Sequence, residues 1–280
     1  MFTSINIATV YSLAAVLCWG ASDFIGGYAS RRANAFLIAT IVNFSGLLFI
    51  SILAIAEHSA LPSHHSLAWA LAGGISGGFA LAFFYRALST GRMGLAAPVS
   101  AVLGAAIPTA VAFFSEGLPK PVQIAGFILA GFGIWMVSHH DEDSQPEGIG
   151  LAVLAGIGFA GFFLCMKQAG NESALWIAAG SRASSLVVTL TVVILSRAFR
   201  DADRPRIALA VIAGCLDVSG SVFFIRASQT GRLDKAVVLA SLYPVVTVLL
   251  ARFFLREHFT RWKAVGIIAA LIAVPLISIR

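Results

Sequence analysis

The sequence predicts an all-α membrane protein with ten transmembrane helices, arranged as two inverted five-helix repeats. Composition, the length of the apolar runs and an internal repeat lead to this prediction. Of the 280 residues, 59% are hydrophobic and 11% are charged, and the mean hydropathy is +0.90. Soluble domains carry roughly 25% charged residues. Most of the surface of this chain is therefore expected to face lipid.

Ten apolar runs are long enough to cross a bilayer, since a helix needs about 20 apolar residues to span the hydrocarbon. They are too long for barrel strands and lack strict alternation of polar and apolar residues, so helices are expected. The first run has no basic segment before it and exceeds the core of a signal peptide, which predicts a retained span. The runs lie near residues 6–28, 35–56, 67–89, 93–115, 121–138, 148–169, 174–196, 206–228, 233–255 and 261–279.

A polar segment over residues 139–147 separates five runs from five. Its adjacent histidines and carboxylates could suggest a metal site. No ligand geometry is enforced there, so a solvated linker is the preferred interpretation. We therefore predict a first repeat over 1–138, a linker over 139–147 and a second repeat over 148–280.

The two halves share a sequence signature. Segment 83–93 recurs as 223–233, and seven of the eleven aligned pairs are identical, where chance would give about one. Trp19-Gly20 aligns with Phe159-Ala160 in the same register. Because each repeat has an odd number of spans, the second copy must enter the membrane from the opposite side. Inverted repeats are a recurrent plan of secondary transporters, in which a central site opens to each side in turn.

Glycines and a proline mark places where helices are expected to meet closely or to bend. Gly73, Gly74, Gly77 and Gly78 form two overlapping GxxxG patterns, which are typical of close helix packing in membranes. Pro244 lies inside the ninth run, where a proline can kink a helix.

Several short motifs occur in a fixed order along the chain: Trp19-Gly20, the Arg-Ala-x-x-x-Gly turns at 86–91 and 226–231, Tyr243-Pro244, Leu255-Arg256-Glu257, Trp262 and Gly266. Over essentially the whole chain, this ordered set resembles the EamA-type branch of the drug/metabolite transporter superfamily. The resemblance implies ten helices in two five-helix repeats around a central cavity. It also implies transport, often export, of amino acids or other metabolites.

The chain departs from that family pattern in two places. Many relatives carry an arginine in both the second and the seventh span, whereas this chain has Asn43 in the second and Arg182 in the seventh. Pro108 of the first repeat is displaced by about one helical turn from the position that matches Pro244. The two halves have diverged, so a symmetric site is not expected.

Charges inside the apolar runs are the strongest candidates for a substrate site. A charge at the bilayer centre costs about 2.5–3.5 kcal/mol, and those that remain face a cavity or a partner. Asp217, near the centre of the eighth run, could bind a substrate ammonium or carry a proton. Arg182, within the seventh run, could hold a substrate carboxylate through two parallel hydrogen bonds. The structural alternative is an ion pair of Arg182 with Asp217 or Asp23.

An aromatic side chain and a carboxylate lie together in the first run. Asp23 follows Trp19 by one helical turn, so the two share a helix face. This pairing suits an organic cation. The alternative places Asp23 near the headgroups, paired with Arg31 or Arg32. Three further side chains are secondary candidates for the cavity wall: Asn43, Tyr85 and Tyr243.

We recognise no catalytic constellation in the sequence, and neither an HExxH nor a Walker pattern occurs. We therefore expect no enzymatic activity, no cofactor and no metal, and transport driven by a substrate or proton gradient. The net charge of +6 is interpreted as membrane topology, because Lys and Arg cluster between the apolar runs. Nucleic acid is not an expected partner.

The leading prediction is a secondary transporter that exports a small polar metabolite, such as an amino acid, by alternating access around a central cavity. The expected partners are that substrate, the lipid bilayer and a proton as coupling ion. The expected location is the bacterial cytoplasmic membrane. Two alternatives stay open: a membrane-embedded ligand-binding scaffold or sensor, and a flippase for a lipid-linked substrate.

Overall fold

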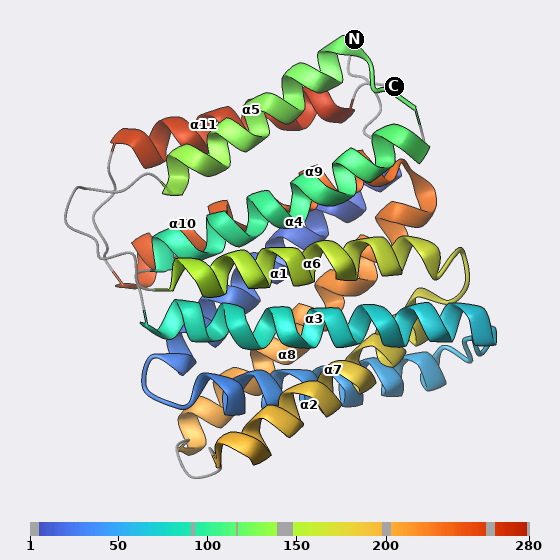
Figure 1. Cartoon of the computed structure of the whole chain (residues 1–280), viewed down its shortest axis with the longest axis vertical. Helices are drawn as coiled ribbons and strands as arrows, with labels where there is room; N and C mark the ends of the chain where they lie inside the picture. The colour runs from blue at the N-terminus through green and yellow to red at the C-terminus, as the bar shows by residue number, and fades with distance from the viewer. Residues whose placement is uncertain are drawn as a thin grey trace.

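The computed structural model describes residues 6–90, 93–115, 117–138, 148–197, 203–255 and 261–278. Within these ranges the chain forms helices and no strands (Figure 1). The predicted linker 139–147 and Glu257 lie outside the described residues. The helices are α1 (Ile7–Ser30), α2 (Ala35–Ala56), α3 (His64–Thr90), α4 (Met93–Ser115), α5 (Pro121–Ser138), α6 (Ile149–Gln168), α7 (Ala174–Ser196), α8 (Arg204–Thr230), α9 (Leu233–Ala240), α10 (Tyr243–Leu255) and α11 (Arg261–Ser278).

The polar breaks between the apolar runs supply helix caps. Asn6, Asn34, Ser173 and Asp203 precede α1, α2, α7 and α8, and each side chain accepts a hydrogen bond from a backbone N–H in the first turn. Such caps satisfy amides that have no partner within the helix. The breaks that separate the runs therefore also fix where these helices begin.

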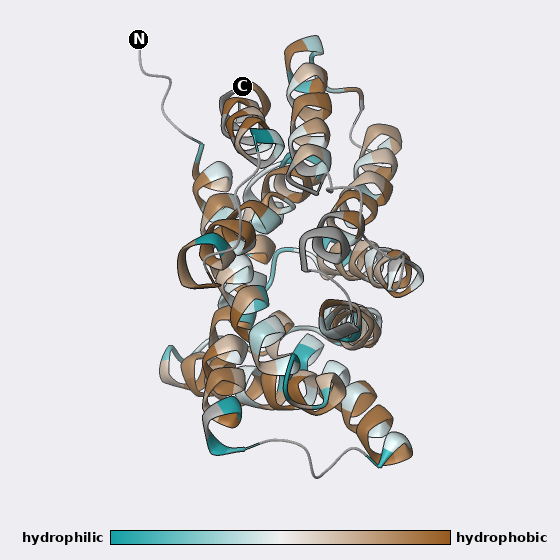
Figure 2. Cartoon of the chain, turned by 90° about the vertical axis from the view of Figure 1, so that its left-hand side faces the viewer, coloured by the Kyte–Doolittle hydropathy of each residue, from teal (hydrophilic) through white to brown (hydrophobic). Residues whose placement is uncertain are grey.

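The chain is an all-helical, multi-pass membrane protein. Among the described residues, seven stretches are long and apolar enough to cross a bilayer, at 7–30, 35–56, 64–89, 150–168, 174–196, 206–230 and 233–255. Two shorter apolar stretches cover 99–115 and 121–133. Apolar residues run along the length of the helices (Figure 2), and the large apolar side chains of Phe114 and Phe253 are 93% and 79% exposed. The predicted total of ten spans stays a prediction.

The ninth run does not form one continuous helix. Helix α9 ends at Ala240, and α10 begins at Tyr243. Pro244 explains the break, because it has no N–H to donate and its ring would clash with the carbonyl of Ala240, four residues earlier. The kink expected at Pro244 is therefore a two-residue turn between two helical segments, and it lies inside the predicted span.

Helices of the two repeats pack mainly against each other rather than within their own repeat. Helix α1 packs on α8 and also meets α9 and α10, whereas α6 packs on α3 and α4. Helix α2 lies against α7 and α8, and α5 pairs with α11 at one side of the molecule (Figure 1). The core is therefore formed between the repeats.

The glycine-rich stretch of α3 brings two helices close, as its GxxxG patterns predict. A Cβ on Gly74 would overlap the carbonyl oxygen of Ser181 in α7, and one on Gly77 would lie 3.3 Å from the Phe162 ring in α6. The stretch also contains a GxSxG pattern, which in hydrolases places a serine on a strand-to-helix turn. Here Ser76 lies inside α3 and donates to the carbonyl of Gly158 at 2.8 Å. Its role is helix packing.

Candidate functional site

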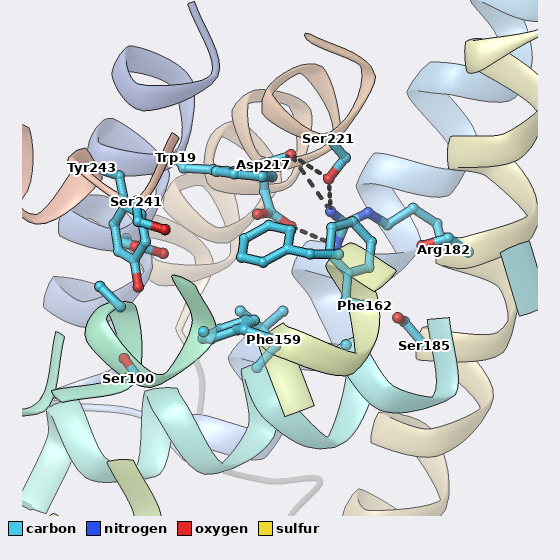
Figure 3. A pocket seen from close by; sticks show the side chains of 17 residues that line it. Trp19, Ser100, Phe159, Phe162, Arg182, Ser185, Asp217, Ser221, Ser241 and Tyr243 are labelled. Carbon is cyan, nitrogen blue, oxygen red and sulfur yellow. Dashed lines mark hydrogen bonds and ion pairs between the residues drawn. The ribbon is translucent and has the colours of Figure 1, made fainter. Parts of the chain in front are cut away.

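A cavity lies between the two repeats, and both contribute to its wall (Figure 3). Helices α1, α3 and α4 come from the first repeat, and α6, α7, α8 and the region around the α9–α10 break come from the second. The lining residues are Trp19, Asp23, Gly77, Leu81, Ser100, Ala101, Gly104, Phe159, Phe162, Phe163, Ser181, Arg182, Ser185, Asp217, Ser221, Ser241 and Tyr243.

The cavity is contracted in this conformation. The space that admits the centre of a water molecule is only about 50 Å³, which is room for a few waters. Binding sites for drug-sized ligands enclose roughly 300–1,000 Å³. A metabolite can therefore enter only when lining side chains or helices move apart.

Arg182 links three helices at one end of the cavity. Its Nη1 forms an ion pair with Asp217 Oδ2 at 2.5 Å and donates to Asn43 Oδ1 at 3.1 Å. Its Nη2 donates to Ser221 Oγ at 2.7 Å and to the Asp217 carbonyl at 3.5 Å (Figure 3). Both charged residues are 7% exposed. The structural alternative considered for Arg182, an ion pair with Asp217, is therefore what this conformation contains.

Trp19 is fixed against the same part of α8. Its indole Nε1 donates to the Asp217 carbonyl at 3.1 Å. The ring centroid lies 5.7 Å from Phe163, 5.8 Å from Phe224 and 6.5 Å from Tyr243. These contacts join α1, α6, α8 and α10, so the indole is part of an aromatic cluster shared by four helices.

A second polar group, formed by Asp23, Ser241 and Tyr243, lines the cavity without such a network. Asp23 is 6% exposed, and no hydrogen bond or ion pair joins it to another described residue. Within the described part of the chain, it is not paired with Arg31 or Arg32. The Ser241 hydroxyl is likewise buried without a hydrogen-bond partner among the described residues, and the Tyr243 hydroxyl is buried with the Ser100 side chain as its one candidate partner there.

The structure brings most of the predicted site residues together. Trp19, Asp23, Arg182, Asp217 and Tyr243 all line the cavity. The other two predicted residues lie behind its wall.

Asn43 orients Arg182 and also donates to Thr189 Oγ1 at 3.4 Å. Tyr85 is fully buried, and its hydroxyl contacts Gly26 of α1. Neither Asn43 nor Tyr85 is among the lining residues. Their predicted role in substrate binding would therefore be indirect.

Part of the wall was missed at the sequence level, although the repeat contains a signal for some of it. Residues 140 positions apart are equivalent, so Phe159 is the counterpart of Trp19 and Phe163 that of Asp23 (159 − 19 = 163 − 23 = 140). Both members of each pair line the cavity. Applying the repeat to the candidate residues would have identified these two. The other missed members include Phe162, Ser185, Ser221 and Ser241.

Comparison with known families decides the class of protein. The model of the EamA-like transporter family matches residues 6–139 and, a second time, residues 146–279. The chain belongs to the EamA-like transporter family. This EamA-like protein is thus a multi-pass member of the drug/metabolite transporter superfamily, with two copies of the family unit.

Two individual matches accompany the family. An uncharacterised protein of Methanocaldococcus jannaschii is 29% identical to this EamA-like transporter over 133 residues, which cover 47% of this chain and 93% of that protein. The match is about the length of one family unit. A crystal structure of another protein superposes with a TM-score of 0.74 over 96% of this chain and 95% of that chain, at 18% identity. This likeness concerns the fold alone.

Proposed function

We propose that this protein is a secondary transporter that exports a small polar metabolite, such as an amino acid, across the bacterial cytoplasmic membrane. The observation that supports this most is the cavity between the two family units, which carries buried charges in an apolar protein. Alternating access of two inverted repeats would open this cavity to each side of the membrane in turn.

Hydrogen bonds between the repeats hold one end of the molecule, at the loops after α2 and α6. We call this contact the loop clasp and define it as residues 59–66 with 169–176. The Ser63 amide donates to Glu172 Oε2 at 2.5 Å, and the Trp176 indole donates to the Ser59 carbonyl at 2.9 Å. Hydrogen bonds from Ser63 keep the pKa of the Glu172 carboxyl below its usual value. In the proposed cycle, this end opens when the clasp separates.

A proton is the proposed coupling ion. Asp23 and Asp217 are the two carboxylates on the cavity wall, and either could carry a proton during one half of the cycle. No Walker pattern occurs in the sequence. A substrate or proton gradient is therefore the proposed energy source.

Counterflow in liposomes tests the proposal. Purified protein is reconstituted, loaded with one unlabelled amino acid or nucleoside at a time, and assayed for uptake of the labelled compound. We expect exchange of at least one polar metabolite, strongly reduced in Asp217→Asn and Arg182→Ala. Saturable binding without exchange would instead indicate a scaffold or sensor, and movement of a lipid-linked compound alone would indicate a flippase. If neither substitution changed the rate of exchange, Arg182 and Asp217 would not be part of the substrate site.

A further inference from the structure

The polar groups of the cavity fall into two sets, which differ in how many hydrogen-bond and ion-pair partners the protein gives them. The first, the ion-pair set, consists of Arg182, Asp217 and Ser221. The Arg182 guanidinium is held through both of its terminal nitrogens by Asp217, Ser221 and Asn43, while its buried Nε has no hydrogen-bond partner among the described residues. This set neutralises its own charge and has little donor capacity left for a ligand.

The second, the open set, consists of Asp23, Ser241 and Tyr243. All three line the cavity. Asp23 forms no hydrogen bond or ion pair with another described residue. The Ser241 hydroxyl is buried without a partner there, and the Ser100 side chain is the one candidate partner of the Tyr243 hydroxyl among the described residues. Buried polar groups are normally hydrogen-bonded. A bound ligand would therefore supply the partner that the open set lacks.

Charge decides which ligand group suits the open set. The charges of Arg182 and Asp217 cancel, so Asp23 is the remaining carboxyl group among the lining residues and lacks a cation of its own. A ligand carboxylate would gain no counter-ion from Asp23, whether that side chain is ionised or protonated. To reach Arg182 it would have to displace Asp217 and leave that carboxylate buried without a cation, which is strongly unfavourable. A protonated amine meets neither obstacle.

The surrounding aromatic side chains suit the same ligand. Trp19 lies one helical turn before Asp23, and its indole is held in place by the Asp217 carbonyl. Phe159, Phe162 and Phe163 form the facing wall on α6. Aromatic faces attract cations, Trp most strongly, and the phenyl rings would cover an apolar ligand body.

We propose that the cavity recognises its substrate through a protonated amino group held by Asp23, with the Ser241 and Tyr243 hydroxyls and the Trp19 ring beside it, and that a substrate carboxylate is not required. The substrate class is then small organic amines with an apolar body. This proposal rests on the transport function proposed above and narrows its substrate.

Three ligands that share the same phenyl-bearing apolar body test the proposal. Phenylalanine, phenethylamine and 3-phenylpropanoate differ only in which charged groups they carry, and their binding to the purified protein is measured directly by calorimetry. We expect phenethylamine to bind at least as tightly as phenylalanine, and 3-phenylpropanoate to bind about tenfold more weakly or worse. Tighter binding of the acid, or no binding of the amine, overturns the proposal.

Substitutions locate the amine. Asp23→Asn should weaken phenethylamine binding about tenfold or more, and Asp23→Glu should restore part of it. The matched control is Asp203→Asn at the exposed start of α8, which should bind as wild type. If Asp23→Asn fails to fold, Tyr243→Phe keeps the ring and removes only the hydroxyl, and it should still bind the amine several-fold more weakly. Wild-type affinity in both folded variants overturns the assignment.

Counterflow on the same preparation separates this proposal from the transport function. Amine binding that depends on Asp23, with no exchange across the bilayer, supports the recognition site and contradicts transport. Exchange of another metabolite in a protein that binds no amine contradicts the recognition site and supports transport.

Discussion

At the scale of single residues, Arg182 determines how three helices meet at the cavity. Its side chain leaves α7 and contacts Asn43 of α2 and both Asp217 and Ser221 of α8. A buried ion pair by itself is weak evidence for stability, because removing two charges from water is costly. Its geometry nevertheless fixes which atoms of α2, α7 and α8 lie against one another, and with them the position of Trp19.

We expect Arg182→Met to lower the free energy of unfolding by about 3–5 kcal/mol, since it leaves Asp217 buried without its cation. The double variant Arg182→Met with Asp217→Asn should recover most of this loss, because no unpaired charge remains. Heat denaturation of the purified protein in detergent measures both. A double variant as unstable as the single one would show that the ion pair is not the source of the effect.

How well a residue could be predicted from the sequence depended on its chemistry. Arg182, Asp217 and Asp23 are unusual in apolar runs, because a charge there is costly, so the sequence pointed to them directly. Phe162 gave no such signal, since a phenylalanine is equally stable facing lipid or a cavity. Tyr85 was placed among the candidates by its hydroxyl, and only packing against Gly26 shows that it lies behind the wall.

At the scale of elements, α3 lies between α6 and α7 and approaches each of them through different glycines. Gly74 and Gly78 face Ser181 and Ser185 of α7, whereas Gly77 faces Phe162 of α6. Small residues allow membrane helices to approach closely, because packing rather than the hydrophobic effect drives their association. Both α6 and α7 carry lining residues, so the width of the cavity depends on this approach.

Gly74→Ala should therefore lower stability by about 1–3 kcal/mol, because the added methyl group would overlap the α7 backbone. Gly131→Ala in α5 is the matched control, since a Cβ there has open space around it. Alanine is the better helix former, so this variant should be as stable as wild type or slightly more so. Samples of each variant are heated, and the gel-filtration peak that remains is followed by fluorescence. The temperature at which half of the peak is lost is the midpoint for that variant. Equal midpoints for the two would contradict the close-packing role of Gly74.

The apolar runs located the helices because each break contains capping or turn residues. The apolar pattern did not predict the turn at residues 241–242. Proline is tolerated inside membrane helices when neighbours satisfy the freed backbone groups, so Pro244 alone does not fix where a helix ends. The structure has a two-residue turn there, with Ser241 and Tyr243 on the cavity wall. The end of a helix segment thus became part of the candidate site.

At the scale of the whole molecule, the loop clasp and the packing of each repeat against the other are the contacts that the proposed opening of the cavity would have to change. Helix α1 packs on α8, and α6 packs on α3, so each repeat is held by the other along its length. The clasp adds contacts at one end, between residues 59–66 and 169–176. Opening that end requires these contacts to separate.

Cross-linking the clasp should stop transport. Ser63→Cys and Glu172→Cys are introduced together after Cys18, Cys165 and Cys215 have been replaced by alanine, and a short, reducible bis-thiol reagent is added. We expect counterflow to be lost and to return on reduction, because the protein can no longer open at this end. Each single-cysteine variant, treated identically, should retain counterflow. Full activity in a completely cross-linked sample would contradict the proposed opening.

The interruption between α9 and α10 has no counterpart in the first repeat. Helix α4 is unbroken over Met93–Ser115, and the position equivalent to Pro244 is Gly104 (244 − 140 = 104). The two repeats therefore differ in helix geometry at equivalent positions. In an alternating-access cycle they exchange roles, and exchanging unequal parts gives two conformations of unequal free energy. The empty protein would then rest facing one compartment, even with identical solutions on both sides, so a preferred direction would be built into the chain itself.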